Sequence, residues 1–288
     1  MTAPALAPPA VALPAKLSAV DFDFVRTLVH KDSAILLEAG KEYLVESRLT
    51  VLARQEGKTS FQSLISDLRT RPDNALRYRV VQAMTTNETS FFRDVAPFDA
   101  LREHVLPDLI TRRAATRTLR IWCAAASTGQ EPYSLAMLIR EHFPALASWR
   151  VEIIATDISR EVLDRAKGAR YSQLEVNRGL PASYLVKYFE KDGLHWRVKP
   201  AIRDMVSYRE LNLIGAWSGV DGADIVMMRN VLIYFDIPTK RKIMANVRRV
   251  LRPDGYFLLG SAESTLNIDE NFKRIAVGRT SCYQLASP

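Results

Sequence analysis

Cysteine and histidine are scarce in this sequence: its 288 residues include two cysteines, Cys123 and Cys282, and four histidines. The cysteines lie far apart, and the histidines are scattered singly, away from the short spacings of metal ligands. We therefore expect no metal site. A low cysteine count of this kind is typical of a reduced, cytoplasmic protein.

Long apolar runs are also missing. No stretch approaches the roughly 18 residues that a membrane-spanning helix needs, so we expect no membrane insertion. The opening stretch MTAPALAPPAVALPAK has no early cluster of lysine or arginine, so we expect no signal peptide. Proline recurs there every few residues and blocks helix and sheet, so we expect residues 1–16 to be a disordered lead.

Acidic residues are outnumbered by basic ones. The net charge is +8, from 40 Lys and Arg against 32 Asp and Glu. Such a balance is compatible with nucleic acid, with an acidic protein surface or with simple solubility. Residues 48–79 contain seven basic and three acidic residues, a local surplus of four positive charges. A solvated helix face is the ordinary explanation of such a run, but it suits docking if the partner is acidic.

Hydrophobic periodicity divides the chain into parts. Residues 17–84 show helical spacing with capping and stop signals, which predicts an N-terminal all-α domain. A polar linker follows at 85–97. From 98 to 288 short apolar strands alternate with helices, which predicts an α/β domain with a parallel, doubly wound, Rossmann-like sheet. Turn residues and the segment LHWRV interrupt this alternation, so we expect a small β-rich insertion at 172–208.

Ligands of a doubly wound sheet bind at the carboxyl ends of its strands. The loop after the first strand, within IWCAAASTGQEPYSLAM, is built of small residues that let a ligand approach the backbone. It lacks G-x-G-x-x-G, and Glu131 would repel phosphate, so a dinucleotide is poorly supported. A cofactor with hydroxyls, an amine and a cationic centre, such as S-adenosylmethionine (SAM), fits better. Alternatively, Glu131 only complements the dipole of its helix.

Polar residues also follow the next strands. Asp157 is suited to accept hydrogen bonds from ribose hydroxyls, or else it caps the following helix, a task that Ser159 could take over. Arg229 and Asn230 stand in an apolar run, where burial without partners would be costly. Tyr234 lies toward the carboxyl side of the same run. It would either line the site or pack in the core with its hydroxyl at the rim.

Five segments, namely TTNETSFFRD, IWCAAASTGQEPYSLAM, ATDIS, RNVLIYFD and GYFLLGSAES, together resemble the CheR family of chemotaxis receptor methyltransferases. The resemblance covers roughly residues 22–285, and the insertion would be the family's β-subdomain. It implies methyl transfer from SAM to glutamate side chains on the cytoplasmic helices of chemoreceptors, giving glutamyl methyl esters and S-adenosylhomocysteine (SAH). The implied cofactor contacts are Asn87, Thr89, Arg93, Glu131, Asp157, Asn212, Leu213, Arg229 and Asn230. Arg93 and Tyr234 would lie nearest the reaction, and Asn212 and Leu213 would meet the adenine.

The expected chemistry agrees with these residues. A glutamate side chain has a pKa of about 4.3 and is already a nucleophile at neutral pH, so no general base is needed. Arg93 is always protonated and can orient a carboxylate through forked hydrogen bonds. The sequence leaves open whether that carboxylate belongs to the substrate or to the methionine moiety of SAM. Phe91 and Phe92 are expected to anchor the linker in an apolar junction between the domains.

Two features depart from the family pattern. Members with a long β-subdomain loop bind a C-terminal receptor peptide as a tether, whereas the turn in FEKDGLHWRV is short. We therefore expect no peptide tether, and direct docking of the receptor on the basic helical domain through Arg48 and Arg54. The loop CAAAS is richer in alanine than the usual pattern, which leaves the cofactor affinity open.

Two other functions fit parts of the sequence. Methyltransferases of nucleic-acid amines commonly use an Asn/Asp-Pro-Pro-aromatic loop, but the only Pro-Pro here is Pro8–Pro9. We therefore expect no nucleic-acid substrate. A non-catalytic adaptor that binds cofactor and partner is not excluded by any residue, although no expected catalytic position is missing.

Overall fold

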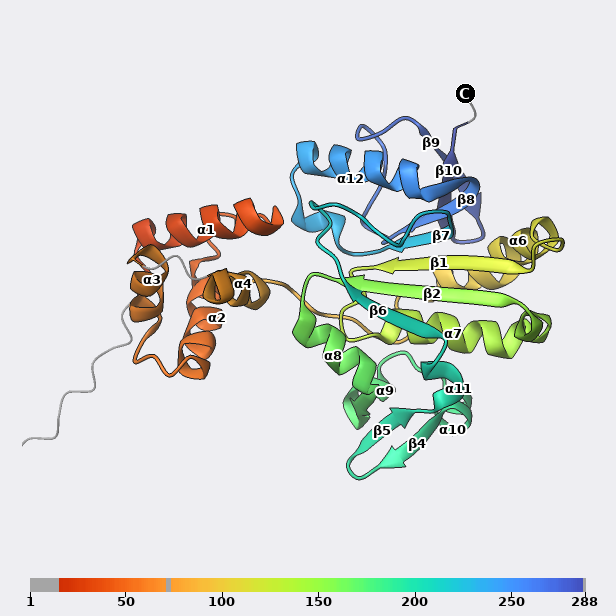
Figure 1. Cartoon of the computed structure of the whole chain (residues 1–288), viewed down its shortest axis with the longest axis horizontal. Coiled ribbons are helices and arrows are strands. Elements are labelled where there is room, and N and C mark those ends of the chain that lie inside the picture. Colours follow the sequence, from red (N-terminus) through yellow and green to blue (C-terminus); the bar gives the residue numbers. More distant parts are fainter. Residues whose placement is uncertain (1–15, 71–73, 287–288) are drawn as a thin grey trace, which may run out of the picture. The chain divides into compact units, whose positions relative to one another are not determined.

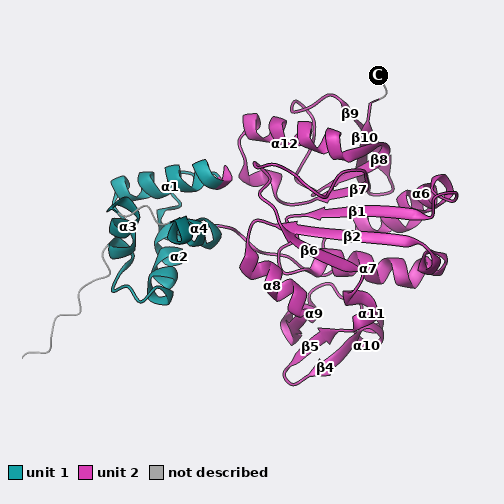
Figure 2. Ribbon diagram, viewed as in Figure 1, with its two compact units in different colours: residues 1–32, 36–84 teal, residues 33–35, 85–288 magenta. Residues whose placement is uncertain are grey.

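The computed structural model describes residues 16–70 and 74–286, so the predicted lead at 1–16 lies, apart from its last residue, outside the described residues. The chain divides into two compact units, which Figure 2 shows in different colours. The first unit comprises residues 1–32 and 36–84, and the second comprises 33–35 and 85–288. Among the described residues, no helix has the length and apolarity to cross a bilayer. Nor do their His, Cys, Asp and Glu side chains gather in threes as metal ligands do.

The first unit is all-helical, as the spacing of its apolar residues predicts. Its helices are α1 (Ala19–Ser33), α2 (Glu42–Gln55), α3 (Phe61–Thr70) and α4 (Asn74–Ala83). In α2, Val45, Leu49 and Leu52 recur at helical spacing and are buried. The hydroxyl of Ser60 accepts a hydrogen bond from the backbone N–H of Ser63 at 3.2 Å, so Ser60 caps the start of α3.

Much of the basic surplus of the first unit is engaged in ion pairs. The pairs are Lys58–Asp67, Arg69–Asp21, Arg77–Asp32 and Arg79–Glu56. All four involve partly exposed side chains, where such pairs contribute about 0–1 kcal/mol each. Arg54, by contrast, is exposed on α2 and has no ion-pair partner within the described residues. Several of the basic residues therefore form ion pairs within the unit, whereas Arg54 is available at its surface.

The second unit is built on a seven-stranded sheet with the strand order β6-β2-β1-β7-β8-β10-β9 (Figure 1). The strands are β1 (Thr118–Ala124), β2 (Arg150–Asp157), β6 (Val206–Glu210), β7 (Ala223–Met228), β8 (Leu251–Leu259), β9 (Phe272–Val277) and β10 (Thr280–Leu285). The first five strands in this order are parallel, which confirms the predicted doubly wound sheet. The pair β9 and β10 adds an antiparallel hairpin at one edge, which the sequence pattern does not predict.

Helices pack on both faces of the sheet. The principal ones are α7 (Gln130–His142), α8 (Arg160–Gly168) and α12 (Ile237–Val250). Ile121 and Cys123 of β1 share one core with Leu135 of α7, whereas Trp122 shares a second core with Ile243 of α12. Successive side chains of a strand point to opposite faces, so a strand covered on both sides must be apolar throughout. This is why the buried part of β1, residues 121–124, appears in the sequence as a continuous apolar run.

The helical segment that follows the linker contains a wider turn. It consists of α5 (Ala96–Ala100), the π-helical turn η1 (Leu101–Val105) and α6 (Leu106–Arg112). The N–H of Leu106 bonds to the carbonyl of Leu101, five residues earlier. Pro107 follows directly, and since proline has no N–H it removes one bond from the regular helical pattern at this point.

The predicted insertion is a small three-stranded antiparallel sheet with the order β3-β5-β4. Its elements are β3 (Arg170–Ser172), α9 (Gln173–Asn177), α10 (Ala182–Tyr188), β4 (Phe189–Asp192), β5 (His195–Val198) and α11 (Pro200–Arg203). Only Gly193 and Leu194 join β4 to β5, with φ at +60° for the glycine. The predicted range of 172–208 needs correction at both ends, because β3 begins at Arg170 and because β6, which begins at Val206, pairs with β2 in the main sheet.

Candidate functional site

The loops that follow β1, β2, β7 and β8 start from the carboxyl edge of the parallel strands, where a ligand is expected. Some of their residues have left-handed backbone conformations: φ is +54° at Ala125, +50° at Ser127 and +58° at Asn230. Such angles are uncommon outside glycine and cost on the order of 1–3 kcal/mol, so surrounding contacts must hold them. These contacts identify the residues that build the site.

Asp157, at the end of β2, connects two of these loops. One carboxylate oxygen accepts the backbone N–H of Ser127 and the other accepts that of Ser159, both at 2.9 Å. Ser159 itself caps α8 through the N–H of Val162, as expected. Burial raises the pKa of Asp157, and the backbone N–H groups oppose that shift. The backbone N–H of Ile158 is a third donor to this carboxylate, so Asp157 is not a free acceptor and keeps about one of its four lone-pair positions for a ligand.

Gly129 allows the loop after β1 to pass through a narrow space. Its φ is +93°, and a Cβ at this position would lie 2.8 Å from the Tyr208 hydroxyl oxygen and 2.9 Å from the Ala166 Cβ. Next to it, the Tyr171 hydroxyl donates to the carbonyl of Thr128 at 2.7 Å. Tyr171 comes from β3, so the small sheet directly supports the candidate cofactor loop.

Gly129→Ala is expected to lower the free energy of unfolding by about 2–4 kcal/mol, from backbone strain and overpacking together. Urea unfolding of the full chain measures this. Gly168→Ala is the matched control, because Gly168 has no left-handed φ and nothing lies within 4 Å of an added Cβ. The free energy of unfolding of the Gly168→Ala control should be unchanged or about 1 kcal/mol higher. Equal losses in both variants would contradict the steric argument.

Arg229, directly after β7, is the centre of a buried ionic network. Its side chain is only 1% exposed. One terminal nitrogen donates to Glu131 at 2.8 Å, and the other donates to the Asp94 carboxylate at 2.9 Å and to the Arg93 carbonyl at 2.7 Å. Burial raises the pKa of Glu131, and the charge of Arg229 opposes this. The structure therefore brings the predicted site residues Glu131 and Arg229 together, and Arg229 connects them to the linker.

The linker that Arg229 holds is strained. Phe92, Asp94 and Val95 all have positive φ, at +48°, +69° and +45°. For a β-branched residue such as Val95 this is a genuine outlier. The backbone N–H of Phe92 also donates to the Ser134 hydroxyl of α7 at 2.9 Å. The segment is thus fixed from two sides, by Arg229 and by α7.

The two linker phenylalanines anchor it within the second unit. Phe91 is fully buried, and its ring packs edge-on against Tyr171 at 5.0 Å and Phe189 at 5.6 Å, both in the small sheet. Phe92 packs against Phe98 at 5.1 Å. The anchor is real, but the expected location between the domains needs correction, because every one of these partners belongs to the second unit.

The two residues expected nearest the reaction are both accessible. Arg93 is half-buried, and its guanidinium donates to the Glu88 carbonyl at 3.0 Å. Tyr234 lies in the short helix η3 (Leu232–Tyr234) and is also half-buried, so it is not a core residue. Asp236 caps the start of α12 and thereby fixes the end of the same turn.

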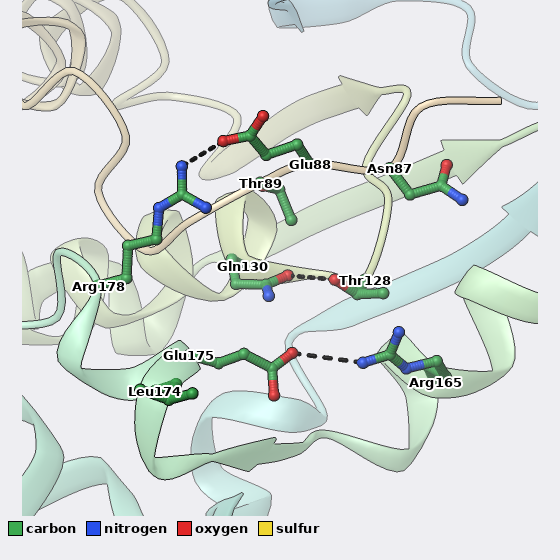
Figure 3. A pocket seen from close by; sticks show the side chains of 9 residues that line it. All are labelled: Asn87, Glu88, Thr89, Thr128, Gln130, Arg165, Leu174, Glu175 and Arg178. Carbon is green, nitrogen blue, oxygen red and sulfur yellow. Dashed lines mark hydrogen bonds and ion pairs between the residues drawn. The ribbon is translucent and has the colours of Figure 1, made fainter. Parts of the chain in front are cut away.

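Asn87 and Thr89 line a hollow of about 260 Å³ beside the loop after β1 (Figure 3). The other lining residues are Glu88, Thr128, Gln130, Arg165, Leu174, Glu175 and Arg178. The carbonyl of Asn87 accepts the Ser127 hydroxyl at 2.8 Å. Figure 3 also shows the ion pairs Glu88–Arg178 and Glu175–Arg165 at this hollow. The linker and the cofactor loop are thus in direct contact.

Asn212 and Leu213 follow β6 at the other side of β2. Asn212 lines a second hollow, of about 540 Å³, and its side-chain oxygen accepts the N–H of Ile214 at 3.2 Å. Leu213 is 8% exposed and packs into the core that includes Trp122. Leu213 can therefore reach a ligand mainly through its backbone.

Two residues of the site are not singled out by the sequence pattern. Asp94 binds Arg229, and Glu263 binds the backbone of the turn after β7. Asp94 lies in TTNETSFFRD and Glu263 lies in GYFLLGSAES, two of the five segments that resemble the CheR family. Glu263 is an acid placed just after the carboxyl end of a buried strand, the same signal that identifies Asp157.

Two domains of known proteins match this chain. The CheR methyltransferase SAM-binding domain matches residues 87–280, and the all-alpha domain of CheR methyltransferases matches residues 20–85. The chain belongs to the CheR methyltransferase family. The match to the SAM-binding domain covers the linker from Asn87 onward, the small sheet and the main sheet as far as the first residue of β10.

Relatives of this CheR chain match along most of their length. Chemotaxis protein methyltransferase 1 of Pseudomonas aeruginosa is 42% identical over 259 residues, 88% of this chain and 94% of the relative. Chemotaxis protein methyltransferase Cher2 of Pseudomonas putida is 39% identical over 269 residues, covering 92% and 98%. The chemotaxis protein methyltransferase of Vibrio anguillarum is 38% identical over 267 residues, covering 91% and 95%. The chain is thus a SAM-dependent methyltransferase of the chemotaxis type.

The polar groups at the strand ends of this CheR chain fit SAM. Asp157 retains a lone pair for a hydroxyl, and Glu131 supplies a carboxylate for a cationic or amine group. The buried Nε of Arg229 has no hydrogen-bond partner among the described residues. Since buried donors are normally paired, this nitrogen is suited to an acceptor on the cofactor.

Proposed function

We propose that this protein methylates glutamate side chains on the cytoplasmic helices of chemoreceptors, forming glutamyl methyl esters and SAH. The observation that carries the proposal is the fixed position of Arg93. Its backbone carbonyl is bound by the buried Arg229, while its half-buried side chain donates to the carbonyl of Glu88, a residue that lines the same hollow as Asn87 and Thr89. Such a cation can bind a substrate carboxylate in one orientation.

SAM, when bound, supplies an electrophilic methyl group on a sulfonium. The residues would hold it in three places: Asp157 at the ribose, the loop of Asn212 and Leu213 at the adenine, and Glu131 and Arg229 at the amino-acid part. Asn87, Thr89 and Asn230 would complete the enclosure. A glutamate carboxylate is ionised at neutral pH, so no group has to remove a proton. Arg93 would orient that carboxylate and Tyr234 would align it.

The first unit would dock the receptor. On α2, Tyr43, Ser47, Val51 and Arg54 form an exposed stripe along a hollow of about 720 Å³. The stripe carries the positive charge of Arg54 and no carboxylate, which suits an acidic amphipathic helix, although Glu42 and Glu46 also line the hollow. Arg48 is half-buried and lies about 120° around the helix from Arg54, so it is less central. The two-residue turn between β4 and β5 supports docking without a C-terminal peptide tether. Such a receptor substrate would place the reaction in the cytoplasm.

Radiolabelled SAM and receptor-containing membranes test the proposal. Label that appears on the receptor and is released by mild base indicates a methyl ester. Base-stable label on RNA would support a nucleic-acid amine methyltransferase instead. Tight SAH binding without transfer to any acceptor would support a non-catalytic adaptor. Either of the last two results would reject the proposed reaction.

Charge reversal at Arg54 and Arg48, as Arg54→Glu and Arg48→Glu, is expected to raise the KM for receptor about five- to tenfold. The KM for SAM should stay within twofold, because neither residue belongs to the SAM-binding domain. Arg54→Glu should have the larger effect, since Arg54 lies on the exposed stripe. Lys31→Glu, an exposed charge on α1, is the control. Equal changes in the KM for receptor and the KM for SAM would contradict a docking role for Arg48 and Arg54.

A further inference from the structure

Glu263, in the loop after β8, has a carboxylate that is enclosed by backbone amides. One oxygen accepts the N–H groups of Asn230 and Gly260, both at 2.7 Å. The other accepts those of Val231 at 2.9 Å and Leu232 at 2.7 Å. A carboxylate has about four lone-pair positions, and all four are used here. Glu263 is therefore occupied by the protein itself and is not a ligand-binding group.

Three of these donors are consecutive residues of the turn after β7. Successive N–H groups that converge in this way form a nest that attracts anions. Glu263 supplies the anion from within the chain. Without it, the nest would present positive polarity at the edge of a site that receives a sulfonium cation. Burial is the main cause of the raised pKa of Glu131, but the charge of Glu263 adds to it, so its field extends into the site.

The same carboxylate controls the conformation of Asn230. Asn230 has φ at +58°. Its side-chain nitrogen Nδ2 lies 2.8 Å from the point that a Cβ on Gly260 would occupy. Met228 and Leu259 are the last paired residues of β7 and β8. Glu263 connects the two loops just beyond that pair, where the sheet no longer holds them. The direction of the Asn230 side chain thus depends on this connection.

We propose that Glu263 is a positioning residue for methyl transfer: it holds the turn 230–232 so that Asn230 is directed at SAM and Tyr234 at the substrate. This inference rests on the proposed function, because it assigns a purpose to the geometry of the same site. The role needs a carboxylate. An amide has only one oxygen, and its NH₂ group would oppose two of the four N–H donors.

Glu263→Gln is therefore expected to raise the Kd for SAH about 20-fold, measured by calorimetry on the full chain. Glu270→Gln, an exposed acid in the same loop, is the control and should leave the Kd within twofold. Glu263→Asp keeps the charge with a shorter reach, and we expect an intermediate increase of about fivefold. If the Glu263→Gln variant does not fold, the Kd of the Glu263→Asp variant is compared with that of the control instead.

A double-mutant cycle with Asn230→Ala separates positioning from general stability. If Glu263 acts through Asn230, the 20-fold effect should fall below threefold when Asn230 is already alanine. An undiminished effect in that background would overturn the inference, as would an unchanged Kd in Glu263→Gln. Failure of the unmodified chain to bind SAH would overturn the cofactor site and the inference together, so the two failures are distinguishable.

Discussion

Replacing Arg93 with alanine should lower kcat for receptor methylation at least about 100-fold while the melting temperature changes by less than about 2 °C. The activity loss follows from orientation: a carboxylate held by forked, charged hydrogen bonds loses its alignment when the fork is removed, and misalignment alone costs on the order of 10²-fold. Methyl transfer assays with saturating SAM and purified receptor membranes measure kcat directly.

The stability of the Arg93→Ala protein should be nearly unchanged because the linker depends on the backbone of Arg93. The carbonyl that Arg229 binds is still present in alanine, and the lost side-chain bond reaches only the partly exposed Glu88 carbonyl. Such a bond contributes about 1 kcal/mol or less at an exposed position.

Two further variants test the geometry of the Arg93 contact. Arg93→Lys keeps the charge without the fork, so its kcat should fall between those of the alanine variant and the unmodified chain. Arg102→Ala removes a partly exposed arginine that pairs with Asp99 and Glu103, and should leave kcat unchanged. A kcat within threefold of normal in Arg93→Ala would contradict the orienting role.

The sequence predicted the central strands well and the edges of the sheet poorly, for a physical reason. Central strands such as β1 and β7 are covered on both faces, so each contains a buried apolar run, at 121–124 and 225–228, that is easy to recognise. The edge strand β6, with the sequence VSYRE, has no buried residue among its five positions. Its segment therefore resembles the insertion before it, and only pairing with β2 shows where it belongs.

The site shows a similar division. Strand ends are visible in the sequence, so Glu131, Asp157 and Arg229 could be placed at one edge of the sheet. Their partners could not be predicted: Arg229 is 98 residues from Glu131 and 135 from Asp94 in the chain. Nothing local in the sequence indicates which carboxylate a buried guanidinium will meet. Strain is equally invisible, since the positive φ of Val95 results from contacts made by its neighbours.

The buried network makes a second strong prediction, for Arg229→Met. Breaking a buried ion pair by removing one partner typically costs about 3–5 kcal/mol, because the remaining charge is left without compensation. Asp94 is about one-third exposed and can regain water, but Glu131 cannot. We therefore expect a loss of about 3–5 kcal/mol in the free energy of unfolding at neutral pH, measured by urea unfolding, together with loss of SAH binding.

The pH dependence of that loss identifies its cause. In the unmodified chain, burial already raises the pKa of Glu131, and Arg229 opposes the shift. Without Arg229 the pKa should rise further. A carboxyl whose folded pKa exceeds its unfolded value binds more protons in the folded state, so stability falls as pH rises from the unfolded pKa, about 4.3, to the folded one. The Arg229→Met protein should thus be markedly less stable at pH 7.5 than at pH 5.

Adding Glu131→Gln to Arg229→Met tests whether Glu131 is the responsible group. The amide is neutral at every pH, so the double variant should lose the extra pH dependence and regain part of the stability at pH 7.5. If the single and double variants show the same dependence on pH, the buried charge of Glu131 is not the cause. The loss would then come from the linker, whose strained turn at Phe92–Val95 would have lost its hold on the Arg93 carbonyl and the Asp94 carboxylate.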